Sequence, residues 1–91
     1  MEKYKEFSVQ ARNGIFTIVV YRGVTPPFKA IITGVLPGFA KIIRLGEPAP
    51  IMEEEEFGPV EVEGNFENTV IEEAKVVIEE KSGPVISCKE I

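Results

Sequence analysis

Histidine and aspartate are absent from this 91-residue chain, and cysteine occurs once, as Cys88. Without histidine, the usual Cys/His zinc patterns cannot form, and the commonest general base of enzymes is missing. We therefore expect no enzymatic activity and no cofactor. A lone cysteine cannot form an intramolecular disulfide, so Cys88 is predicted to be a small, partly buried apolar side chain on a late strand. A disulfide between two copies is the alternative.

Long apolar runs are also missing. The longest uncharged stretch covers 11 residues, from Ala30 to Ala40, and is interrupted by Gly34, Pro37 and Gly38. A helix that spans a bilayer needs about 20 apolar residues, so no membrane segment is expected. The first six residues lack the apolar core of a secretory signal. We expect a soluble, cytoplasmic protein that forms a single domain over residues 1–91.

Side-chain amides are scarce, since Gln10 is the only glutamine and there are three asparagines. All 15 acidic residues are glutamates, which together with seven lysines is similar to the composition of thermophilic proteins. Apolar residues make up 44% of the chain and charged residues 27%, a balance that is typical of a packed globular protein.

Charge is unevenly distributed along the chain. Residues 1–46 carry seven basic and two acidic side chains, whereas residues 47–91 carry three basic and 13 acidic ones. This division could produce a dipolar surface that favours association. Alternatively, the two halves interleave in the fold and their charges cancel, because opposite charges on neighbouring strands pair favourably.

An Asn13-Gly14 turn signal lies between two alternating segments. This dipeptide is typical of a two-residue type I′ hairpin loop, which would place Ala11 opposite Phe16, Val9 opposite Ile18 and Phe7 opposite Val20. We expect these apolar side chains to form the core. The reverse face of the second strand would carry Ile15, Thr17, Val19 and Tyr21, which is too apolar for a freely solvated surface. Either another part of the chain or a second subunit should cover it.

Further strands are predicted at residues 28–35, 39–45, 60–63 and 85–91, separated by proline and glycine. Residues 46–50 should form an extended loop that leads to an acidic loop at 53–56. Phe57-Gly58-Pro59 should then turn the chain into the strand at 60–63.

Residues 69–82 are ambiguous between helix and strand. Thr69 and Glu72 match a capping box, Gly83-Pro84 would end a helix, and the apolar residues recur at helical spacing: Val70, Ile71, Ala74, Val77 and Ile78. The β-branched residues favour a strand instead. We favour the helix. The predicted fold is α+β, with a mostly antiparallel sheet of about six strands and one helix in the C-terminal half packed on a face; all-β is the alternative.

Two candidate binding segments follow from the charges. The weak candidates for a divalent cation, or for a basic partner, are Glu53, Glu54, Glu55 and Glu56, although a solvated loop is the simpler interpretation. The basic half could bind single-stranded nucleic acid through Tyr4, Arg12, Tyr21, Arg22, Lys29 and Lys41. A net charge of −5 and a pI near 4.8 argue against this second alternative.

The favoured function is a non-enzymatic interaction or structural module, either a homo-oligomer or a small subunit of a larger intracellular complex. The basis is a short chain with two apolar faces on one strand. The predicted partner is a second copy or another protein rather than nucleic acid or a membrane. The interface candidates are Ile15, Val19, Tyr21, Phe28 and Phe39.

Overall fold

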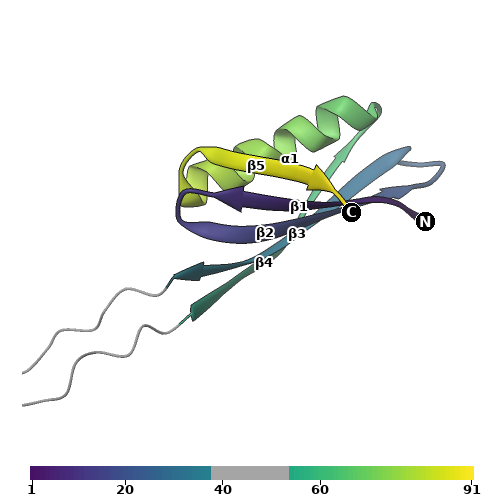
Figure 1. Ribbon diagram of the computed structural model, residues 1–91. Helices are drawn as coiled ribbons and strands as arrows, with labels where there is room; N and C mark the ends of the chain where they lie inside the picture. The colour runs from purple at the N-terminus through teal and green to yellow at the C-terminus, as the bar shows by residue number, and fades with distance from the viewer. Residues whose placement is uncertain (38–53) are drawn as a thin grey trace, which may run out of the picture.

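A computed structural model describes residues 1–37 and 54–91, in which an antiparallel sheet of five strands carries one helix on a single face (Figure 1). In chain order the elements are β1 (Glu2–Ala11), β2 (Gly14–Arg22), β3 (Phe28–Pro37), β4 (Glu54–Gly64), α1 (Glu67–Ser82) and β5 (Val85–Glu90). Across the sheet the strand order is β4-β3-β2-β1-β5. The predicted α+β class is confirmed, while the strand expected at 39–45 and the loop expected at 46–50 lie outside the described residues.

The hairpin of β1 and β2 forms as predicted, but its register differs. Ala11 pairs with Gly14, Val9 with Phe16 and Phe7 with Ile18, so the turn consists of Arg12 and Asn13 rather than Asn13 and Gly14. The described residues include no non-glycine residue with positive φ, so the predicted type I′ turn is wrong. The shifted turn donates two backbone hydrogen bonds of 3.0 Å, from Arg12 N–H to the Pro84 carbonyl and from Asn13 N–H to the Ser82 carbonyl.

The core nevertheless lies where the alternating pattern placed it. The predicted and observed registers differ by two residues, and side chains alternate with a period of two, so every residue keeps its face. The fully buried side chains on the helix-facing side of the sheet are Val9, Phe16, Ile18, Val20, Ala30 and Ile32. Phe7 packs against this cluster and is only half-buried.

Helix α1 covers that core and joins β4 at one edge of the sheet to β5 at the other (Figure 1). Val70, Ala74 and Ile78 recur every four residues and are completely buried. Burial of this stripe against the sheet outweighs the weak helix propensity of its β-branched residues. The predicted capping box at Thr69 is wrong, because α1 begins at Glu67 and its N-cap residue makes no side-chain hydrogen bond. Among the described residues, no helix has the length and apolarity needed to cross a bilayer.

Strand β4 replaces the loop and turn expected at residues 54–59. Gly34 pairs with Phe57 and Ile32 with Val60, so β4 carries one extra residue, a β-bulge, between these pairs. Gly58 has a φ of 88°, and a Cβ at this position would overlap the carbonyl oxygen of Ile32. Only glycine adopts this conformation without strain. The bulge also accommodates Pro59, which has no N–H to donate, on an edge strand.

Candidate functional site

The face of the sheet opposite α1 carries a row of largely apolar side chains on its two central strands, β2 and β3. They form four cross-strand pairs, which we call the central ladder: Ile15 with Val35, Thr17 with Thr33, Val19 with Ile31, and Tyr21 with Lys29. The Ile15 side chain is 63% exposed and Val35 is 38% exposed. No helix or strand within residues 1–37 and 54–91 covers this open face, since α1 lies on the other side (Figure 1).

A depression of about 930 Å³ lies on the open face, near the β1–β2 turn. Its floor is lined by the two pairs of the central ladder that lie nearest this turn, Ile15 with Val35 and Thr17 with Thr33. Gln10 and Arg12 line it on the β1 side, and Glu56 and Pro59 line it on the β4 side. An apolar centre bounded by polar and charged groups is the usual anatomy of a protein contact surface.

The β4 side of the open face is acidic. We define the acidic rim as Glu56, Glu61 and Glu63, all exposed, together with Lys29 of the central ladder. The Lys29 Nζ lies 3.1 Å from an oxygen of Glu61 and 3.9 Å from an oxygen of Glu63. One lysine therefore contacts two glutamates. With three glutamates and one lysine, the acidic rim keeps a net negative charge.

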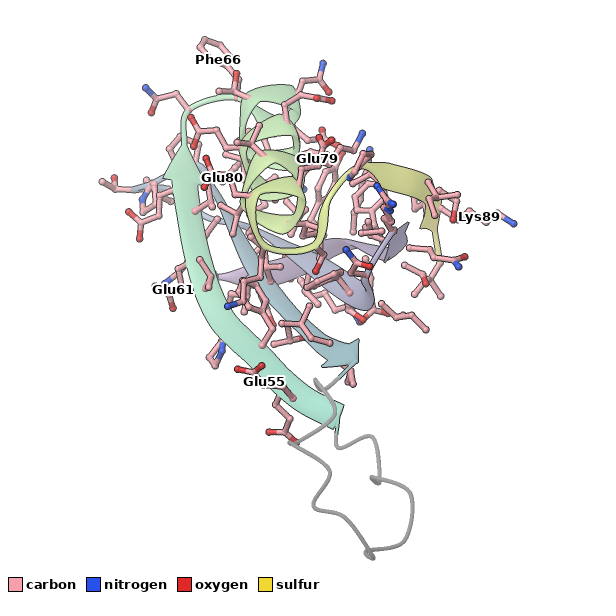
Figure 2. The ribbon with its side chains drawn as sticks, turned by 90° about the vertical axis from the view of Figure 1, so that its left-hand side faces the viewer. Glu55, Glu61, Phe66, Glu79, Glu80 and Lys89 are labelled. Carbon is pink, nitrogen blue, oxygen red and sulfur yellow. The ribbon has the colours of Figure 1, made fainter. Side chains whose placement is uncertain are left out.

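The opposite side of the open face is basic. We define the basic rim as Lys3, Glu6, Arg12 and Lys89; strand pairing places Lys3, Glu6 and Lys89 on the open face, and Arg12 lines the depression. The Lys3 Nζ lies 3.4 Å from a carboxylate oxygen of Glu6, which leaves two cations in excess. Figure 2 shows Glu61 and Lys89 projecting from opposite margins of the sheet.

The interface candidates divide into three groups. Ile15, Val19 and Tyr21 lie together on the open face. Phe28 lies on the helix-facing side, where it is half-buried and its ring centroid is 6.3 Å from that of Tyr4. Phe39 lies outside the described residues. Their interface role stays a prediction.

Sequence reasoning missed Ile31 and Val35, which complete the central ladder. Their signal was present, because both alternate along β3 with the buried Ala30, Ile32 and Leu36, although the predicted strand ended at residue 35. That alternation places Ile31 and Val35 on the face opposite the core.

The acidic run does not form one cluster. Glu55 pairs with Leu36 and Glu56 with Val35, so their side chains project from opposite faces of the sheet. Two carboxylates arranged in this way cannot bind the same cation. Glu53 lies outside the described residues, and within residues 1–37 and 54–91 no group of three or more potential ligands could hold a metal ion.

The candidate nucleic-acid residues are distributed over two faces. The guanidinium of Arg22 lies 4.7 Å from the ring centroid of Tyr4, on the side that also holds Phe28. Tyr21 and Lys29 lie on the open face, where Lys29 contacts glutamates. Arg12 lies at the β1–β2 turn, and Lys41 falls outside the described residues. Within residues 1–37 and 54–91, these candidate basic side chains therefore do not form a continuous track for a phosphate backbone.

Ion pairs join the basic and acidic halves of the chain, as the interleaved alternative predicted. Besides the contacts of Lys29, the Lys5 Nζ lies 2.5 Å from a carboxylate oxygen of Glu67 at the start of α1. The hydrogen bond to Glu67 raises the pKa of Lys5 above its usual value of 10.5, against a smaller opposing effect of desolvation. The surface charges thus cancel locally in part, while the two rims of the open face keep opposite signs.

Cys88 is partly buried on β5, as predicted, and the structure pairs it with the core residue Val9. It therefore lies on the helix-facing side of the sheet, away from the central ladder.

Comparison of the chain with protein-family models, with curated proteins and with solved structures finds no match.

Proposed function

We propose that this domain is a non-enzymatic protein-interaction module and that the open face of its sheet is the contact surface. The central ladder carries the proposal. Ile15 with Val35 and Val19 with Ile31 form two apolar cross-strand pairs on the two central strands, with Thr17 and Thr33 between them. Charged residues flank these pairs on both sides. Contiguous exposed apolar surface with a polar border is typical of protein contact sites.

Beside the central ladder, on β1, the open face is polar. Ser8 and Gln10 of β1 lie beside Thr17 and Ile15, and both are exposed. The antiparallel sheet thus has an ordinary solvated margin and an apolar centre. Burying the apolar centre against a partner would remove it from water, which stabilises a complex by about 25 cal/mol per Å² of apolar area. Self-association, or a role as a small subunit of a larger intracellular complex, belongs to the same proposal.

Site-specific photo-crosslinking tests this proposal. A photoreactive phenylalanine analogue replaces Val19 on the open face, and in a control it replaces Val76, which is 52% exposed on α1. The chains are expressed in cells of the source organism and irradiated. We expect discrete adducts of defined mass from position 19 and none from position 76.

A second variant separates specific docking from random collisions. Ile31→Lys introduces a charge next to Val19, its neighbour across the β2–β3 ladder, and should abolish the adducts from position 19. Circular dichroism checks that the variant keeps its fold. The proposal is wrong if position 19 gives no adduct, or if both positions give the same mixture of adducts.

A further inference from the structure

We propose that the open face binds a second copy of this chain, face to face, about a two-fold axis that runs parallel to the strands. This inference rests on the proposed function of the open face and names its partner. The observation that carries it is the opposite sign of the two rims. The acidic rim has three glutamates and one lysine, whereas the basic rim has three basic side chains and Glu6.

A two-fold axis along the central ladder exchanges the two sides of the sheet. The strand order is β4-β3-β2-β1-β5, so an axis between β3 and β2 places β4 of one copy over β1 of the other, twice in each dimer. The acidic rim then faces the basic rim. An axis that crosses the strands at right angles would instead place β4 over β4 and bring glutamates together. Charge therefore selects the axis parallel to the strands.

The strand register extends the match to individual residues. Four residues form one row across the sheet, Lys3, Tyr21, Lys29 and Glu63, because each pairs with the next. The proposed axis reverses this row onto its copy. Lys3 of each copy then faces Glu63 of the other, and Tyr21 faces Lys29, an arrangement that suits an ion pair and a cation–π contact.

The other end of the face matches in the same way. Gln10, Ile15, Val35 and Glu56 form a second row, so the proposed axis places the Gln10 amide opposite Glu56 and Ile15 opposite Val35. Between the two ends, Val19 faces Ile31, which completes an apolar centre. Two sheets that pack in this aligned manner resemble a β-sandwich.

One row opposes the association. Glu6, Val19, Ile31 and Glu61 share a row, so the proposed axis brings Glu6 of one copy towards Glu61 of the other. Each of these carboxylates already has a lysine partner within its own chain, at 3.4 Å for Glu6 and 3.1 Å for Glu61. Their charges are therefore partly neutralised before the copies meet.

A charge-swap experiment on the full chain tests the inference. Sedimentation equilibrium of the wild type should give a particle of about twice 10.1 kDa. Glu63→Lys and Lys3→Glu should each raise the dissociation constant of the dimer by roughly tenfold or more, because each reverses two symmetric contacts. Glu55→Lys, an exposed residue on the other face of β4, is the matched control and should leave the dimer unchanged.

Restoring the charge pattern makes the test specific. The double variant Lys3→Glu/Glu63→Lys should dimerise nearly as well as the wild type. An equimolar mixture of the two single variants should form the mixed dimer in preference to either homodimer. A wild-type monomer at millimolar concentration overturns the inference, as does a Glu63→Lys effect no larger than that of Glu55→Lys, or a double variant that stays monomeric.

The two proposals fail in distinguishable ways. A monomeric wild type whose position 19 still crosslinks to a different protein overturns the homodimer and supports the contact surface. The absence of any adduct from position 19 overturns both proposals. A crosslinked adduct of twice the chain mass, together with the charge-swap pattern, supports both.

Discussion

Phe16 packs its ring over the bare backbone of Gly34, its direct partner across β2 and β3. The Phe16 side chain is completely buried, and its ring meets that of Phe57 edge-on, with 5.5 Å between the centroids. A Cβ built on Gly34 would overlap the Phe16 ring and approach the Ile15 carbonyl oxygen to 2.8 Å. The absence of a side chain at position 34 therefore makes room for the largest residue of the core.

Gly34→Ala should lower the free energy of unfolding by about 1–3 kcal/mol, the usual cost of overpacking a filled core. Gly23→Ala is the control, because its Cβ would meet chiefly the flexible side chain of Met1, at 3.0 Å. Urea unfolding followed by circular dichroism measures both variants. Equal effects at the two positions would contradict this account of Phe16 and Gly34.

Ser82 is almost fully buried at the end of α1, and its hydroxyl has no hydrogen-bond partner among the described residues. Because a buried, unsatisfied hydroxyl is destabilising, Ser82→Ala should raise the free energy of unfolding by up to about 1 kcal/mol. Ser8→Ala, at an exposed position of β1, should have little effect. The thermal unfolding midpoints of the three proteins provide the comparison, and a lower midpoint for Ser82→Ala would disprove the prediction.

The β1–β2 turn should be unusually protected from hydrogen exchange. Arg12 and Asn13 are exposed turn residues, yet their N–H groups donate to the carbonyls of Pro84, in the α1–β5 connection, and Ser82, the last residue of α1. We expect both amides to exchange slowly, because they open only when the α1–β5 connection detaches. The amide of Val24, in the exposed β2–β3 connection, should exchange rapidly. Nuclear magnetic resonance resolves these amides, and rapid exchange at both turn positions would show that the docked turn does not persist in solution.

The ion pair of Lys5 and Glu67 should make stability depend on alkaline pH. The pKa of Lys5 is raised in the folded state, so the pair stabilises the fold fully below pH 10.5 and this contribution is lost as the pH rises through the higher folded value. Glu67→Gln should therefore destabilise the protein at neutral pH, and the difference from wild type should shrink above pH 10.5. Glu73→Gln, an exposed position of the same helix, serves as control. Urea midpoints across this pH range test the prediction; a difference that is constant with pH would contradict it.

Local sequence pattern predicted the buried face and the end of α1, but not its start. The spacing of Val70, Ala74 and Ile78 predicted the buried stripe of α1, and Gly83 ends the helix as expected, with its N–H donating to the Glu79 carbonyl at 2.9 Å. The helix start was missed because Thr69 has the side chain of a capping residue without occupying that position. A capping motif describes a local preference, whereas here the first turn of α1 is tied to β1 by Glu67 and Lys5.

The sequence predicted the β2 side of the candidate site but not its β3 side or its rims. Alternation in the second strand placed Ile15, Val19 and Tyr21 opposite the core, and the structure shows them there. The partner strand and the two rims could not be derived, because pairing between residues distant in the chain depends on strand order. The run at 54–56 was also misread as a loop, since only pairing with β3 makes these glutamates part of a strand.

The sequence by itself determined which face of the hairpin and which stripe of α1 form the core, because alternation along strands and the four-residue spacing in α1 are properties of local backbone geometry. Tertiary structure alone decided the turn at Arg12 and Asn13, the bulge at Gly58 and the opposite charge of the two rims. Each of these depends on contacts between segments far apart in the chain: the α1–β5 connection against the turn, β3 against β4, and β1 and β4 on opposite sides of one apolar ladder.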